Sequence, residues 1–153
     1  MTDKEAVLQD YRAAYSEFRS AVEGLTEVQM EKPFLDNWSV REIAGHLAGW
    51  HDQMTLGLER MARGERPTPE GVDWSNIQAF NDRFARDVAD RRAADILRDL
   101  DSKVAVFEGA LRALPDDRFG PNKTATRMAA GAGYEHLREH AEEIKQARAA
   151  GKL

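Results

Sequence analysis

The sequence contains no cysteine among its 153 residues, and this absence restricts the chemistry that the protein can perform. A thiolate nucleophile, a cysteine-ligated zinc ion and a disulfide bond are all excluded. Any bound metal ion must therefore be held by histidine, carboxylate or water ligands.

Long apolar runs and an excess of basic residues are also missing. No run of about 18 apolar residues is present, and the N-terminus is too charged for a signal peptide, so we expect a cytoplasmic protein with no membrane partner. Lys and Arg number 22 against 27 Asp and Glu, which gives a net charge of −5. This charge would repel a phosphate backbone, and no basic stripe with interleaved aromatic residues is present. We therefore expect no nucleic-acid partner.

The overall composition is that of a globular chain. Hydrophobic residues make up 42% and charged residues 32%, which is typical of soluble folded proteins and not of disordered ones. A chain of this length buries about two thirds of the surface that it exposes when unfolded. Because no repeat, low-complexity tract or linker divides it, we expect a single domain over residues 1–153.

Apolar residues in steps of three and four predict helices in the first part of the chain. The first predicted helix covers about residues 2–24. Thr26 then begins a capping-box pattern that predicts one short turn. A second long helix is capped by Ser39, to whose backbone amide Glu42 can reach back, and it ends at Gly64.

A loop over residues 63–73 precedes a long third region of apolar periodicity. Asp73 or Ser75 caps this region, which extends to Leu114. Its length exceeds that of an ordinary globular helix, so we predict a break at residues 90–92 that leaves two stacked pieces.

The last predicted helix begins at Thr124 or Thr126 and ends near Ala150. No segment alternates between apolar and polar residues with a period of two, so no strand is expected. Four long amphipathic segments predict an all-α protein with the architecture of a four-helix bundle.

Histidines provide the candidate functional site. His136 and His140 are four residues apart and therefore lie on one helix face, about 40° apart. This spacing allows two imidazoles to bind one ion, although two solvated side chains would show the same pattern. His46, on the second long helix, is a candidate third ligand. His51 is five residues further, about 140° around the helix, so both cannot readily share one ion.

Three neutral imidazoles on a divalent ion would leave one to three coordination positions open, which is the catalytic pattern. Such an ion can acidify bound water or bind an incoming thiolate. Nitrogen donors suit zinc, nickel and other late first-row ions. The alternative interpretation is that the three histidines are polar residues at the rim of a crevice in the bundle.

Further residues are candidates for the wall of a pocket or for hydrogen bonds to the imidazoles. Trp50 shares a helix face with His46, one turn later, and Trp38 precedes the same helix; both are otherwise core or rim residues. Glu139 could orient an imidazole N–H, or it could be a solvated surface carboxylate. His51 is either an additional pocket residue or an exposed side chain.

Two short segments resemble a known family. Residues 37–50, with the sequence NWSVREIAGHLAGW, resemble the opening of the second helix in the DinB-like superfamily. Residues 136–144, with the sequence HLREHAEEI, resemble the closing His-x-x-x-His-x-x-x-Ile of the same superfamily. Residues 73–81 are similar but less specific.

The resemblance implies a four-helix bundle of the DinB/YfiT-like type, with an up-up-down-down style of connection. It also implies a divalent metal ion, with zinc or nickel favoured, bound by His46, His136 and His140. Members of the superfamily include metal-dependent hydrolases and S-transferases that use bacillithiol or mycothiol, and many form dimers. A small-molecule substrate, a low-molecular-weight thiol and a homodimer are therefore expected, whereas the catalytic residues stay unknown.

Two other functions stay open. The position of Trp50, directly after His-Leu-Ala-Gly, also resembles the colibactin self-resistance branch of the superfamily. That branch is implied to hydrolyse cyclopropanes without needing the three histidines, which would make this chain a metal-free hydrolase or a sequestering protein. The other alternative is a non-catalytic bundle that serves as a binding or dimerisation module.

Overall fold

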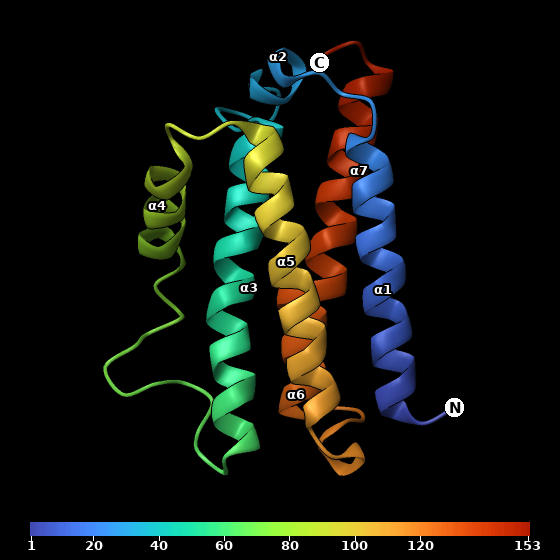
Figure 1. Ribbon diagram of the computed structural model, residues 1–153, viewed down its shortest axis with the longest axis vertical. Helices are drawn as coiled ribbons and strands as arrows, with labels where there is room; N and C mark the ends of the chain where they lie inside the picture. Colours follow the sequence, from blue (N-terminus) through green and yellow to red (C-terminus); the bar gives the residue numbers. More distant parts are fainter.

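A computed structural model describes residues 1–153 and contains α-helices but no β-strand. The bundle consists of four long helices (Figure 1): α1 (Asp3–Val22), α3 (Val40–Ala62), α5 (Ala93–Ala113) and α7 (Glu135–Ala149). The shorter helices are α2 (Glu27–Glu31), α4 (Ile77–Val88) and α6 (Thr124–Met128). The predicted all-α class and four-helix bundle are confirmed. None of the helices combines the length and apolar character that crossing a bilayer requires.

The four long helices follow an up-down-down-up order, which corrects the up-up-down-down order that the resemblance implied. In Figure 1, α1 and α7 run upward while α3 and α5 run downward. The chain returns from the lower end of α3 to the upper end of α5 through α4, which lies outside the bundle against α3. The predicted break is present at residues 89–92, but the two pieces are not stacked, because α4 packs on α3 instead of continuing the line of α5.

The caps predicted at Asp73 or Ser75 and at Thr124 or Thr126 are absent, because α4 and α6 follow Asn76 and Lys123, whose side chains make no cap bond. Capping boxes begin three other helices, at the predicted Thr26 and Ser39 and also at Thr2. In each, the side chain of the capping residue accepts a hydrogen bond from the backbone three residues later, and the side chain at that position bonds back. The pairs are Thr2 with Glu5, Thr26 with Gln29, and Ser39 with Glu42. Two backbone donors that a helix leaves free are satisfied at each start.

The predicted final helix is interrupted by a π-helical segment. Residues 129–134 form this segment between α6 and α7. Because a π turn holds more residues than an α turn, it rotates the helix face that follows, and such turns often occur at functional sites. Small residues allow the wide turn to approach α1: a Cβ added at Gly133 would lie 3.0 Å from the ring of Tyr11.

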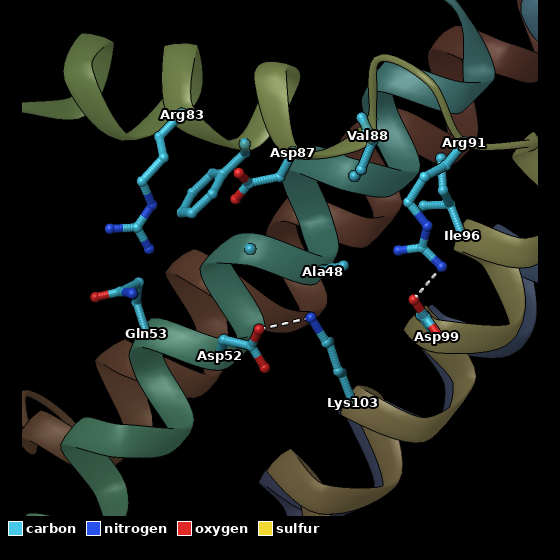
Figure 2. Close-up of a pocket in the computed structure, with 13 residues that line it drawn as sticks. Ala48, Asp52, Gln53, Arg83, Asp87, Val88, Arg91, Ile96, Asp99 and Lys103 are labelled. Atoms are coloured by element: carbon cyan, nitrogen blue, oxygen red, sulfur yellow. Dashed lines mark hydrogen bonds and ion pairs between the residues drawn. The ribbon is translucent and has the colours of Figure 1, made fainter.

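The contact of α4 with α3 depends on two glycines one turn apart. A Cβ added at Gly45 would lie 2.8 Å from Val88, and one added at Gly49 would overlap the ring of Phe84. Figure 2 shows Val88 directed from the end of α4 toward the turn of α3 that carries Ala48. α4 can therefore lie closer to α3 than a helix surface with larger side chains would permit.

We expect Gly49→Ala to destabilise the protein, although alanine favours helices more than glycine does. The new methyl group would force Phe84 and α4 away from α3, and overpacking of this kind costs about 1–3 kcal/mol of unfolding free energy. Chemical denaturation followed by circular dichroism measures the change.

Gly109→Ala is the matched control, because Gly109 also lies inside a helix and its added Cβ would meet no atom within 4 Å. This variant should gain about 0.5–1 kcal/mol from helix propensity alone. Equal stabilisation by both substitutions would contradict the close packing of α4.

Candidate metal centre

Three histidines from two helices meet between α3 and α7. The Nε2 atom of His136 lies 2.7 Å from Nε2 of His46 and 3.0 Å from Nε2 of His140. All three ligand atoms lie within 4.8 Å of one another. His46 and His140 are buried, with 8% and 7% of their surface exposed. The fold therefore brings together the three histidines that the sequence singled out.

The outer nitrogen of His46 is held by Asn81 of α4. The Oδ1 atom of Asn81 lies 3.0 Å from His46 Nδ1 and 3.0 Å from Nε1 of Trp50. An indole N–H can only donate, so the Asn81 atom that it faces is the carbonyl oxygen. His46 therefore donates through Nδ1, and when the ring is neutral its Nε2 carries a lone pair.

The other two rings are oriented in the same way. His140 Nδ1 lies 2.6 Å from the carboxylate oxygen Oε1 of Glu143 and donates to it. The backbone carbonyl of Ala132, one turn earlier in the π-helical segment, favours a proton on the His136 ring. Because Nε2 of His136 faces the other two rings, we place this proton on Nδ1. Each of the three Nε2 atoms thus presents a lone pair to the others.

The environment keeps all three rings neutral. Burial, together with the smaller effect of a charge on His136, lowers the pKa of His46 and that of His140 to about 3. Burial also lowers the pKa of His136. Three lone pairs that converge without a proton between them repel one another, whereas a cation at their centre would satisfy all three. This donor set fits a divalent metal ion.

A polar cavity opens beside the histidines. It has a volume of about 390 Å³ and is lined by all three histidines together with Leu35, Asp36, Asn37, Trp38 and Glu139. The Trp38 ring stands edge-on to His46, with ring centroids 4.9 Å apart. Trp38 and Glu139 therefore lie at the cavity, and Trp50 lies behind it through its bond to Asn81.

His51 does not line this cavity, which corrects the suggestion that it is a pocket residue. It is fully buried, with an exposed fraction of 0%. Its Nδ1 lies 2.7 Å from the carbonyl oxygen of Leu47, and its Nε2 accepts a hydrogen bond of 2.8 Å from the hydroxyl of Tyr11. The turn of α3 that carries His51 faces α1 and α5, so both ring nitrogens are satisfied inside the core.

Sequence reasoning missed two residues that contact the imidazoles. Glu143, and not Glu139, bonds His140; its place three residues after His140 was the available signal. Asn81 lies in the segment 73–81, whose resemblance to the DinB-like superfamily was noted without a role for it. Only the packing of α4 against α3 shows that its amide reaches His46.

A second hollow, drawn in Figure 2, lies between α3, α4 and α5 and has a volume of about 150 Å³. Lys103 pairs with Asp52 at 2.6 Å, and Arg91 pairs with Asp99. None of the three clustered histidines lines it. Its charges are largely neutralised by these pairs, so it is not a second candidate for the metal centre.

The fold and the histidine cluster define a helical bundle with a candidate metal centre, and the sequence assigns this bundle to a family. The chain belongs to the family of the mycothiol maleylpyruvate isomerase N-terminal domain, whose sequence pattern matches residues 11–145. This family is part of the DinB/YfiT-like superfamily, so the resemblance of residues 37–50 and 136–144 is confirmed. No curated protein matches the sequence significantly.

Solved structures share the fold at low sequence identity. The colibactin self-resistance protein ClbS, in complex with double-stranded DNA, has a TM-score of 0.81 and 18% identity over 95% of this chain and 94% of its own. The sibling lethal factor precursor DfsB has a TM-score of 0.82 and 17% identity over 100% of this chain and 99% of its own. An uncharacterised protein from Escherichia coli UTI89 has a TM-score of 0.79 and 16% identity, over 97% and 94% of the two chains.

The exclusion of nucleic-acid partners from the net charge is wrong. ClbS has the same fold and is in complex with double-stranded DNA. Net charge is a sum over the whole surface, whereas a duplex contacts only one face of a protein through local phosphate contacts. An acidic balance therefore does not remove nucleic acid from the partners that a bundle of this type can have.

We expect His51 to make the stability of the protein depend on pH below neutrality. Burial lowers the pKa of His51 from its usual 6.5 to about 4 in the folded state. The unfolded chain therefore binds a proton at this position below pH 6.5 that the folded chain binds only near pH 4. The stabilisation by a neutral His51 is complete at pH 7 and is lost as the pH falls through this window, by at most about 1.4 kcal/mol per pH unit.

The measurement compares the wild type with His51→Gln, both treated with a chelator, by urea denaturation between pH 7 and pH 4. Taking the difference between the two proteins removes the contribution of the other titrating groups. The stability advantage of the wild type should shrink as the pH falls. A constant difference over the whole range would show that His51 is not a buried neutral residue.

Proposed function

We propose that this protein binds one divalent metal ion through His46, His136 and His140 and uses it as an enzyme on a small molecule. The reaction that we favour is transfer of a low-molecular-weight thiol to an electrophile. Hydrolysis of a small molecule is the other metal-dependent reaction that we consider. The observation that carries the proposal is the convergence of three Nε2 atoms on neutral rings, with the outer nitrogens of His46 and His140 already bonded to Asn81 and Glu143.

The residues of the chain would prepare the ligands for this ion. Asn81 and Glu143 hold the rings of His46 and His140 in one orientation, and such outer contacts raise the basicity of metal-bound imidazoles. Three nitrogen donors suit zinc or nickel and leave positions open. When bound, the ion would supply a Lewis acid that lowers the pKa of a thiol or of water.

The family name and the composition support a thiol substrate. The family is named for mycothiol maleylpyruvate isomerase, and mycothiol is by its name a thiol. Because this chain has no cysteine, any thiol at the centre must come from a second molecule. The cavity of about 390 Å³ has Asp36, Asn37 and Glu139 in its lining, and these polar groups suit a hydrophilic thiol.

A second candidate is supported by the likeness to ClbS. Its shared fold favours a metal-free hydrolase or a sequestering protein of the colibactin self-resistance type, and it makes duplex DNA a ligand to include in tests. The likeness at 18% identity concerns the fold, whereas the three converging histidines favour a metal-dependent reaction. The single domain, the cytoplasmic location and the homodimer stay predictions, and a non-catalytic binding module is the remaining alternative.

Metal analysis of the untagged protein tests the proposal directly. We expect about one equivalent of zinc or nickel per chain after incubation with the ion and removal of the excess. The double variant His136→Ala/His140→Ala should lose it, because one imidazole cannot hold the ion alone. His51→Gln is the matched control and should keep it. A wild type that retains no ion would exclude the metal-dependent function and leave the ClbS-like alternative.

The contact of Glu143 with His140 should determine metal affinity. We expect Glu143→Ala to weaken zinc binding by about 10- to 100-fold, because His140 loses the carboxylate that orients it. Competition with a chromogenic chelator measures the dissociation constant. Glu139→Ala removes a carboxylate from the same helix that makes no hydrogen bond to the rings, so its effect should be much smaller. Equal losses in the two variants would indicate a general effect of charge instead of this hydrogen bond.

A further inference from the structure

A second cavity shares His46 and His136 with the polar one but has a different character. Its volume is about 320 Å³. Apart from the two histidines, its lining consists of apolar or small residues, namely Trp50, Met54, Trp74, Ile77, Gly131 and Ala132. No charged side chain lines it.

The two cavities lie on opposite sides of the histidine pair along the bundle axis. Trp50 and Met54 are one and two turns beyond His46 on α3. Gly131 and Ala132 precede His136 by about one turn. Because α3 and α7 run in opposite directions, both sets lie on the same side of the pair. Residues 35–38 and 139–140, which line the polar cavity, lie toward the other end.

The polar atoms of the apolar cavity's tryptophans are bonded elsewhere. Trp50 donates its indole N–H to Asn81, and Trp74 donates its own to Gln53 Oε1 at 3.2 Å. The two indoles therefore offer only ring carbons to a ligand. A charged group that entered this cavity would lose its hydration without gaining a partner, except at the histidines themselves.

We propose that this apolar cavity binds the uncharged aromatic or aliphatic part of the substrate and places it beside His46 and His136. The polar cavity on the other side would receive the thiol or water. The assignment of the apolar cavity to one reactant and of the polar cavity to the other rests on the proposed function. Binding of an apolar group in the apolar cavity requires no metal ion. Ile77 at the edge of the cavity has 55% of its surface exposed, and a bound apolar ligand would cover it.

The chain offers an internal reporter for each cavity. It contains three tryptophans, so a ¹H–¹⁵N spectrum should show three indole signals, which single Trp→Phe variants would assign. Trp50 and Trp74 line the apolar cavity and Trp38 lines the polar one. The probe is 2-naphthol, neutral at pH 7, titrated into chelator-treated protein. We expect saturable shifts of the Trp50 and Trp74 signals and a smaller shift of Trp38.

Two comparisons make the experiment specific. The anion 2-naphthoate has a similar size and should bind at least about tenfold more weakly, because its charge has no partner in the cavity. Gly131→Leu should weaken 2-naphthol binding by about tenfold, since a Cβ at Gly131 meets no protein atom within 4 Å and the side chain can occupy the cavity. Gly109→Leu, at a helical glycine with the same open space, should leave binding unchanged.

Absence of saturable binding, a largest shift at Trp38, or equal binding of 2-naphthoate would overturn the inference. Metal content, measured separately on the same preparations, distinguishes this failure from failure of the proposed function. A protein that binds zinc but not 2-naphthol would contradict the proposed role of the apolar cavity and leave the proposed metal centre intact. A protein that binds 2-naphthol through Trp50 and Trp74 but no metal would support the cavity and contradict the metal centre.

Discussion

The close contact between α3 and α4 is the constraint on which the centre depends. Asn81 can reach His46 only because Gly45 and Gly49 present no side chain to α4, so that Val88 and Phe84 lie directly on the helix backbone. Ridges of larger residues would hold the two helices about 8–10 Å apart. Packing at two glycines therefore determines a hydrogen bond that orients a candidate metal ligand.

The electrostatics of the histidine cluster follow from burial and from the outer hydrogen bonds together. Burial disfavours the second proton on each ring at neutral pH, and the bonds to Asn81 and Glu143 place the remaining proton of His46 and His140 on the outer nitrogen, as the Ala132 carbonyl favours for His136. The inner nitrogens are left as facing acceptors, an arrangement that is unfavourable in isolation. In the proposed function, a bound cation relieves this repulsion, so metal binding and the stability of the contact between α3 and α7 are linked.

His51 shows how little the identity of a residue says about its role. It lies on the same helix as His46 and is also neutral, yet its two nitrogens are bonded to Leu47 and Tyr11 inside the core. The difference arises from the face of α3 on which each residue lies. His46 lies on the face of α3 that lines the two cavities, next to α4 and α7. His51 lies on the face toward α1 and α5, where side chains fill the space.

The sequence by itself determined the helices, the capping boxes at Thr26 and Ser39, and the pairing of His136 with His140 on one face, because these features arise from contacts within four residues. It did not determine the docking of α4, the π turn at residues 129–134, the roles of Asn81 and Glu143, or the burial of His51. The net charge likewise led to a wrong exclusion of nucleic-acid partners, since it carries no information about the charge on individual faces of the protein. Only the tertiary structure decided the docking of α4, the contact of Asn81 and the burial of His51, because these depend on side chains from distant segments competing for one space. The bond of Glu143 to His140 is the exception, since it lies within one turn of α7.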